Sequence, residues 1–172
     1  MSPPSPTTSA PRPSRLPALV GFGIVLGVLA SFFLFRSGLQ SVDRQRLEAA
    51  RARWAEQGPQ NYDLEVVVTG RQGAIYEVRV RNGVVAEAIR NHVPLQQERT
   101  FRTWSGPGMF DTIESDVESL EFALANPQDP RRIMLTLKAR FDEKTGLPLE
   151  YLRSEWGSHH DVSWKVSRFE PK

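Results

Sequence analysis

The sequence of 172 residues contains no cysteine. This absence excludes disulfide bonds, thiolate metal sites, cysteine nucleophiles and a lipid anchor attached to a lipobox cysteine. It leaves the redox compartment open, because a chain without cysteine fits either side of a membrane.

The motifs of several large enzyme classes are also missing. The sequence contains no GxGxxG dinucleotide fingerprint, no GxxxxGK[ST] phosphate loop and no GxSxG nucleophile elbow. Histidine is scarce, with three residues. Two of them, His159 and His160, stand next to Asp161 in a predicted turn. Adjacent side chains diverge in an extended backbone, whereas metal ligands must converge from separate elements. We therefore assign no catalytic, cofactor-binding or metal residue. A metal-dependent or hydrolytic enzyme that uses this turn is the alternative.

A strong excess of one charge is missing as well. The chain has 22 basic and 20 acidic residues. Arg12, Arg15 and Arg36 are the only charged side chains among residues 1–36, and without them the rest of the chain has 19 basic and 20 acidic residues. A nucleic-acid-binding domain needs a basic face. We expect no nucleic-acid partner.

The most prominent feature of the sequence is an uncharged, mostly apolar run from Leu16 to Phe35. Twenty helical residues cover about 30 Å, the thickness of a bilayer's hydrocarbon core. This predicts a transmembrane anchor at residues 16–36, which binds the chain to the lipid bilayer. A secretory signal cleaved after Ala30 is the competing interpretation. Within the run, Gly23 and Gly27 form a GxxxG pair that could support a homodimer.

The regions on either side of the run differ in character. Residues 1–15 are rich in proline and serine and are predicted to be disordered. Residues 37–57 favour a juxtamembrane helix, which Gly58 and Pro59 end. Within it, Gln40 to Gln57 has the helical pattern.

Residues 58–172 are predicted to form one α+β domain. Alternating apolar residues indicate strands at 62–68, 75–81, 84–90, 133–141, 149–153 and 162–168. Asn82-Gly83 predicts a type I′ hairpin turn, which would pair Val80 with Val85, and Tyr76 with Ile89, on the buried face. In that register Glu87 would lie on the buried face too, opposite Val78.

Between the two groups of strands, Ser105 and Pro107 mark the start of a helix. The helix carries an apolar stripe and, parallel to it, an acidic stripe. Such a row of carboxylates could hold a divalent cation, but a solvated helix face is far commoner. The apolar stripe comprises Phe110, Ile113, Val117, Leu120 and Leu124, and the acidic stripe Asp111, Glu114, Glu118 and Glu121.

The predicted fold class is therefore α+β, with an N-terminal transmembrane helix and then a small domain. Its order of elements is α-βββ-α-βββ, and an antiparallel sheet with helices on one face is the simplest arrangement.

Several segments of the domain also form a recognisable series. They are Trp54, Asn61 to Leu64, VRVRNGVV at 78–85, MFDTIESDVE at 109–118, ARFDEKTGLPLEY at 139–151 and DVSWKV at 161–166. The series resembles an uncharacterised family of bacterial extracytoplasmic domains, over roughly residues 47–169. This chain departs from the family pattern at Val66 to Val68, where cysteines are frequent. It also has Phe141 and Leu147 where tyrosine is usual.

The resemblance implies an exported, membrane-attached protein without an established reaction. It implies that the domain lies outside the cytoplasm, whereas arginines at 36, 44, 46, 51 and 53 would by the positive-inside rule keep it inside. We expect a single-pass, membrane-anchored, non-enzymatic domain, extracytoplasmic in location, that binds an unidentified protein or cell-envelope partner.

Overall fold

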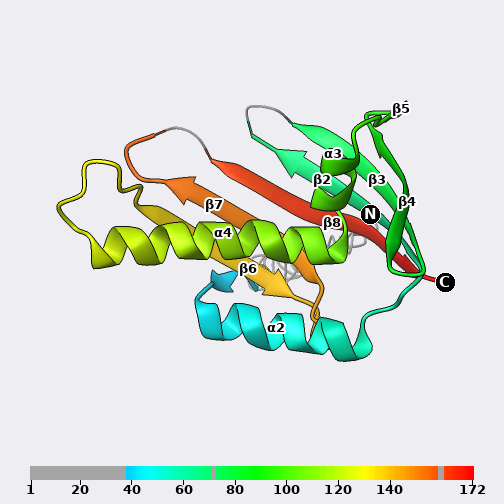
Figure 1. Ribbon diagram of the computed structural model, residues 1–172, viewed down its shortest axis with the longest axis horizontal. Coiled ribbons are helices and arrows are strands. Elements are labelled where there is room, and N and C mark those ends of the chain that lie inside the picture. Colours follow the sequence, from blue (N-terminus) through cyan, green and yellow to red (C-terminus); the bar gives the residue numbers. More distant parts are fainter. Residues whose placement is uncertain (1–37, 71–72, 159–160) are drawn as a thin grey trace, which may run out of the picture. The chain divides into compact units, whose positions relative to one another are not determined.

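An antiparallel sheet of eight strands forms the centre of the structure, a computed structural model that describes residues 38–70, 73–158 and 161–172 (Figure 1). The strand order is β1-β6-β7-β8-β2-β3-β4-β5. The N- and C-terminal hairpins therefore meet in the middle, where β8 pairs with β2. The strands are β1 (Gln40–Ser41), β2 (Tyr62–Thr69), β3 (Ala74–Arg81), β4 (Val84–Arg90), β5 (Val93–Pro94), β6 (Leu135–Phe141), β7 (Pro148–Glu155) and β8 (Val162–Pro171).

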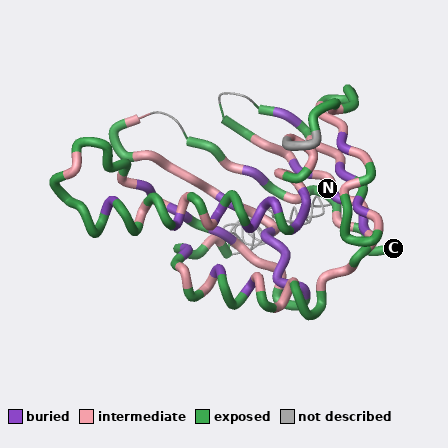
Figure 2. The backbone as a smooth tube through the Cα atoms, viewed as in Figure 1, coloured by how far each residue is buried: buried purple, intermediate pink, exposed green. Residues whose placement is uncertain are grey.

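Three helices pack on one face of this sheet, and Figure 1 shows α4 crossing β6 and β7. They are α2 (Arg44–Gln57), α3 (Glu98–Thr103) and α4 (Gly106–Ala125). Buried residues alternate along the strands and recur along α4 on the side that faces the sheet (Figure 2). The predicted α+β class, with an antiparallel sheet and helices on one face, is confirmed.

The start of α2 differs from the prediction. The helix begins at Arg44, four residues after Gln40, because the Asp43 side chain accepts a hydrogen bond from the Arg46 backbone N–H and caps it. Gln40 and Ser41 instead add β1 to the edge of β6. The Arg46 guanidinium donates to the Ser41 carbonyl at 2.9 Å and to the Gln40 side chain, and so holds this short strand in place.

The hairpin of β3 and β4 turns at Asn82-Gly83 as predicted, with positive φ at both residues. Val80 pairs with Val85, also as predicted. The rest of the predicted register is wrong, because a bulge between Arg79 and Val80 shifts it by one residue. Tyr76 lies opposite Arg90 rather than Ile89. Glu87 lies opposite Arg79, on the face away from the helices, and is not in the core.

A second bulge lies in β8. Arg168 pairs with Glu65 and Val166 pairs with Val66, so Ser167 has no partner in the ladder. The Ser167 hydroxyl instead donates to the side chain of Glu65 at 2.5 Å. The extra residue lets Val166 and Phe169 face the core although three positions separate them.

Helix α4 begins where the sequence predicts, with the Ser105 hydroxyl accepting a hydrogen bond from the Gly108 N–H. Its predicted apolar stripe is buried at Phe110, Ile113 and Val117 but leaves the core at Leu124, which is 62% exposed. The short helix α3 is not among the predicted elements.

Aromatic side chains join α2 and the start of α4 to the sheet. Trp54 contacts Tyr62 edge to face at 5.6 Å, as expected for a tryptophan packed on the sheet. The Tyr62 hydroxyl accepts a hydrogen bond from the backbone N–H of Gly106 at 3.0 Å. A side chain at Gly106 would overlap the Trp54 ring, since a Cβ there would lie 2.5 Å from it. This glycine is therefore fixed by close packing.

Leu39–Lys172 forms one compact unit. Among the described residues, no helix is long and apolar enough to cross a membrane. The predicted tail at 1–15 and the predicted anchor at 16–36, with Gly23 and Gly27, lie outside the described residues, so these interpretations stay predictions.

Candidate binding face

The face of the sheet opposite the helices is uncovered in the described part of the chain, and we call it the open face. Its side chains alternate with the buried ones along each strand. On β6 it carries Thr136, Lys138 and Arg140 between the buried Leu135, Leu137 and Ala139. The register of the strands places the residues of the open face in cross-strand rows, because directly opposite residues in an antiparallel pair lie on the same side.

The half of the open face made by β2, β3 and β4 is covered by ion pairs. Arg81 binds Asp63 at 2.7 Å, and Arg79 binds Glu87 at 2.5 Å. The hydrogen bond from Arg81 lowers the pKa of the Asp63 carboxyl, and Lys172 contributes to the same shift. A small hollow of about 100 Å³ lies among these groups. Because each acid there has a basic neighbour, this half presents little net field to a ligand.

The other half, made by β6, β7 and β8, is different, and we call it the β6–β8 face. Around the middle of these strands it carries Lys138, Arg140 and Lys165 with the acid Glu150, which lies opposite Lys165, a local net charge of +2. At the far end of β8, Arg168 and Glu170 pair with charged groups of the other half and of the C-terminus. Arg140 approaches Glu150 at 3.4 Å. Within the described residues neither Lys138 nor Lys165 forms an ion pair. Two lysines are therefore free to meet a negatively charged partner.

Hydroxyl groups accompany these lysines on the β6–β8 face. Thr136 lies opposite Ser154, and Ser163 lies opposite Thr69 on β2. The Thr69 and Ser163 hydroxyls contact each other at 2.5 Å. A shallow hollow of about 500 Å³ lies over β8 beside them. Its lining includes Val67, Thr69, Glu150, Ser163, Lys165 and Ser167.

An exposed tryptophan stands at one end of the β6–β8 face. Trp156 is 73% exposed, whereas Trp164 is buried in the core. Its backbone N–H continues the β6–β7 ladder by donating to the Met134 carbonyl. Its indole Nε1–H donates to the Thr136 hydroxyl at 2.9 Å, which holds the ring on the open face. A large aromatic ring that is fixed yet uncovered is a typical anchor for a binding partner.

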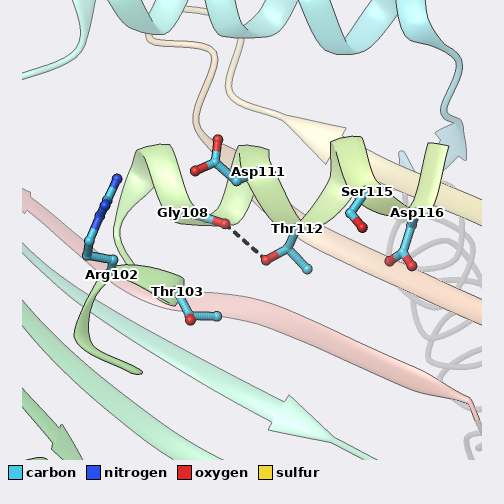
Figure 3. Close-up of a pocket in the computed structure, with 7 residues that line it drawn as sticks. All are labelled: Arg102, Thr103, Gly108, Asp111, Thr112, Ser115 and Asp116. Carbon is cyan, nitrogen blue, oxygen red and sulfur yellow. Dashed lines mark hydrogen bonds between the residues drawn. The ribbon is translucent and has the colours of Figure 1, made fainter. Parts of the chain in front are cut away.

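A second hollow, of about 540 Å³, lies between α3 and α4 on the helical side (Figure 3). Its main acid is already engaged, because Asp116 accepts hydrogen bonds from the Tyr151 hydroxyl at 2.8 Å and from Arg153 at 3.0 Å. Burial, and then the charge of Asp116, raises the pKa of Tyr151, so this phenol stays protonated. The Thr112 hydroxyl donates to the Gly108 carbonyl of its own helix (Figure 3). The bonds of Asp116 attach α4 to β7. The residues lining the hollow are Arg102, Thr103, Gly108, Asp111, Thr112, Ser115 and Asp116.

The groups that the sequence analysis singled out do not come together in the described residues. The acidic stripe of α4 pairs with α2, since Arg51 binds Asp111 and Glu114, and Arg44 binds Glu121. No group of three potential metal ligands occurs in the ranges that the structure describes. His159 and His160 lie outside them, so the alternative based on that turn stays untested. His92 is on the surface, 89% exposed at its side chain.

Sequence reasoning missed Trp156. The predicted strand ended at Arg153, although β7 continues to Glu155. The alternation of inward and outward side chains along this strand could have revealed Trp156. Tyr151 and Arg153 face the helices, so Leu152, Ser154 and Trp156 share the other face.

Comparison of the chain with models of protein families, with curated proteins and with solved structures found no match in any of the three.

Proposed function

We propose that this protein is a membrane-anchored, extracytoplasmic, non-enzymatic domain that binds a protein or cell-envelope partner through the open face of its sheet. The observation that carries the binding role is Trp156, which is 73% exposed and held on that face by Thr136. Exposing a large aromatic ring to water is unfavourable, and tryptophan is enriched at sites that dominate binding energy.

The tether rests on the sequence and on where the described unit begins. Residues 16–35 have no charge, and β1 starts at Gln40. Four residues separate the end of the run from this strand, and an extended chain covers at most about 3.6 Å per residue. Five residue steps lead from Phe35 to Gln40, so if the run crosses a bilayer, the edge of the sheet lies within about 18 Å of the end of the span. In such an anchor, Gly23 and Gly27 would let two copies of the span approach closely.

A fractionation experiment on the full-length chain tests the tether. We expect the protein to remain in the membrane pellet after carbonate extraction, with a mass that includes residues 1–30. Leu26→Arg places a charge in the middle of the run, at a cost of about 3 kcal/mol for insertion, and should release the protein. Leu26→Phe is the matched control and should stay in the pellet. A soluble wild-type chain would contradict the proposal.

A reporter fused after Lys172 tests the orientation. An alkaline phosphatase fusion should be active, because that enzyme matures only outside the cytoplasm, and a green fluorescent protein fusion made through the same export route should be dark. The opposite pair of results would place the domain in the cytoplasm, which is the location that the positive-inside rule predicts from the arginines after the run.

A further inference from the structure

We propose that the partner of the β6–β8 face is an anionic polysaccharide, bound with a sugar ring on Trp156 and its acidic groups on Lys138 and Lys165. This inference rests on the proposed binding function and names the class of ligand. It needs no contribution from the helical side of the domain.

The ring of Trp156 supplies the first part of the argument. One face of a pyranose ring is lined by C–H groups, which pack on an aromatic plane, while its hydroxyl groups point outward. The indole is uncovered and is held by its Nε1–H bond to Thr136. Its orientation is thus set before a ligand arrives, which lowers the entropy lost on binding.

The surroundings of the ring supply the second part. Thr136, Ser154, Ser163 and Thr69 line the face with hydroxyl groups, which can both donate to and accept from sugar hydroxyls. Lys138 lies opposite Leu152, four positions along β7 from Trp156, or about 13 Å at the usual rise of a strand. A span of that length suits several linked sugars and exceeds a single one.

Charge complementarity supplies the third part. The net charge of +2 on this face, with two lysines outside any ion pair of the described residues, favours a ligand with carboxylate or phosphate groups. Nucleic acid suits the face less well. Its affinity depends on many phosphate contacts and on several stacked bases, whereas the described part of this face offers two lysines outside ion pairs and one exposed ring.

A lipid surface also suits the face less well than a polymer. The chain enters the sheet at Gln40, which pairs with Ala139 near one end of β6. Trp156 lies beside Thr136, at the other end of the same strand. The tether and the ring are therefore separated along the strand, and the ring is placed to reach a polymer away from the point of attachment.

Calorimetry with defined oligosaccharides tests the proposal. The probes are tetragalacturonate, which carries four carboxylates, and neutral maltotetraose, each added to the full-length chain in phosphatidylcholine nanodiscs. We expect tetragalacturonate to bind at least about tenfold more tightly than maltotetraose, with an affinity that falls as salt is added. Equal affinities, or no binding of tetragalacturonate, would overturn the assignment to an anionic polysaccharide.

Matched variants locate the site. Trp156→Ala should weaken tetragalacturonate binding at least about tenfold, the loss typical of a central aromatic anchor. Leu124→Ala is its control, since Leu124 is a similarly exposed apolar residue on α4. Lys138→Gln combined with Lys165→Gln should weaken binding and flatten its salt dependence, whereas Lys144→Gln, in the exposed β6–β7 turn, should change neither. Thr136→Val, which frees the indole without removing it, should give a smaller loss. Unchanged binding in Trp156→Ala would refute the site.

Two other ligands distinguish a failure of this inference from a failure of the proposed function. Single-stranded DNA and phosphatidylserine vesicles are added in place of the sugar. If phosphatidylserine vesicles bind more tightly than tetragalacturonate and depend on Trp156, the polysaccharide assignment is wrong and binding of an envelope partner stands. If single-stranded DNA does so, both the polysaccharide assignment and the proposed class of partner are wrong. If the chain also proves soluble on fractionation, the proposed function itself fails.

Discussion

Two glycines with nearly the same backbone conformation show how much packing adds to conformational strain at a single residue. Gly146 and Gly157 have φ of +81° and +79°. A Cβ at Gly146 would lie 2.1 Å from the Ala50 carbonyl oxygen in α2, whereas a Cβ at Gly157 would meet no atom of the described residues within 4 Å. Both positions need the left-handed conformation, but only Gly146 lacks space for a side chain.

We therefore expect Gly146→Ala to lower the free energy of unfolding by about 1–3 kcal/mol more than Gly157→Ala. Gly157→Ala should cost about 1–2 kcal/mol from the strained conformation alone. Urea denaturation of the two variants and the wild type measures both values. Equal losses would mean that α2 moves away from the β6–β7 turn at no cost.

Asp63 provides a pH-dependent prediction at the same scale. The Arg81 guanidinium holds the pKa of this carboxyl below its ordinary value of 3.8. A lowered folded-state pKa stabilises the protein above that ordinary value, and the contribution is lost as the pH falls through the lower folded-state value. The carboxyl of Asp63, followed by NMR, should titrate below an ordinary aspartate, and Arg81→Gln should move it upward. Arg44→Gln, which affects the distant Glu121, should leave it unchanged.

At the scale of elements, the start of α4 depends on one buried hydrogen bond. Tyr62 is 1% exposed, and its hydroxyl accepts from the Gly106 N–H. Tyr62→Phe leaves that N–H without a partner, so we expect a loss of about 1–3 kcal/mol. Tyr76→Phe is the control, because the Tyr76 hydroxyl makes no hydrogen bond within the described residues, and the ring contacts of Tyr76 with Trp104 and Arg90 do not need the hydroxyl. Thermal unfolding compares the two. Equal melting temperatures would show that water replaces the lost acceptor.

The elements that could be predicted are those with a local signal. Alternation gives the long strands, Asn82-Gly83 gives the hairpin turn, and Ser105 gives the start of α4. The two-residue strands β1 and β5 exist only through pairing with β6 and β4, so nothing local marks them. The extra residue Ala86 of β4, between the partners of Arg79 and Val80, was equally hidden, and it reversed the predicted side of Glu87. A strictly alternating pattern cannot reveal an added residue.

The candidate site was predicted less well than the fold. In the sequence, the candidates for chemistry are His159, His160 and Asp161 and the acidic stripe of α4. The stripe instead binds arginines of α2. Trp156 can be recognised as a candidate binding residue only from the pairing of Thr136 with Ser154. This pairing brings the ring and the hydroxyls to the same end of one face.

At the scale of the whole domain, the two faces of the sheet differ in the side chains that they carry. The helical face carries the core and the aromatic contacts that join α2 and α4 to the strands. The open face is divided into a half whose charges neutralise one another and a half that keeps two free lysines and the exposed ring. This division limits the proposed ligand to one half of the sheet, which the variants at Trp156 and Lys138 address.

The unpaired Ser167 has a consequence for how the sequence can change in length. If Ser167 is deleted, only Arg168 remains between Val166 and Phe169. Both residues then still point into the core, and β8 becomes a regular strand. If Lys165 is deleted instead, Val166 turns outward and Ser167 takes its place inside. The same strand thus tolerates a shortening at one position and not at another two residues away, and natural length variation in β8 should concentrate at the position of Ser167.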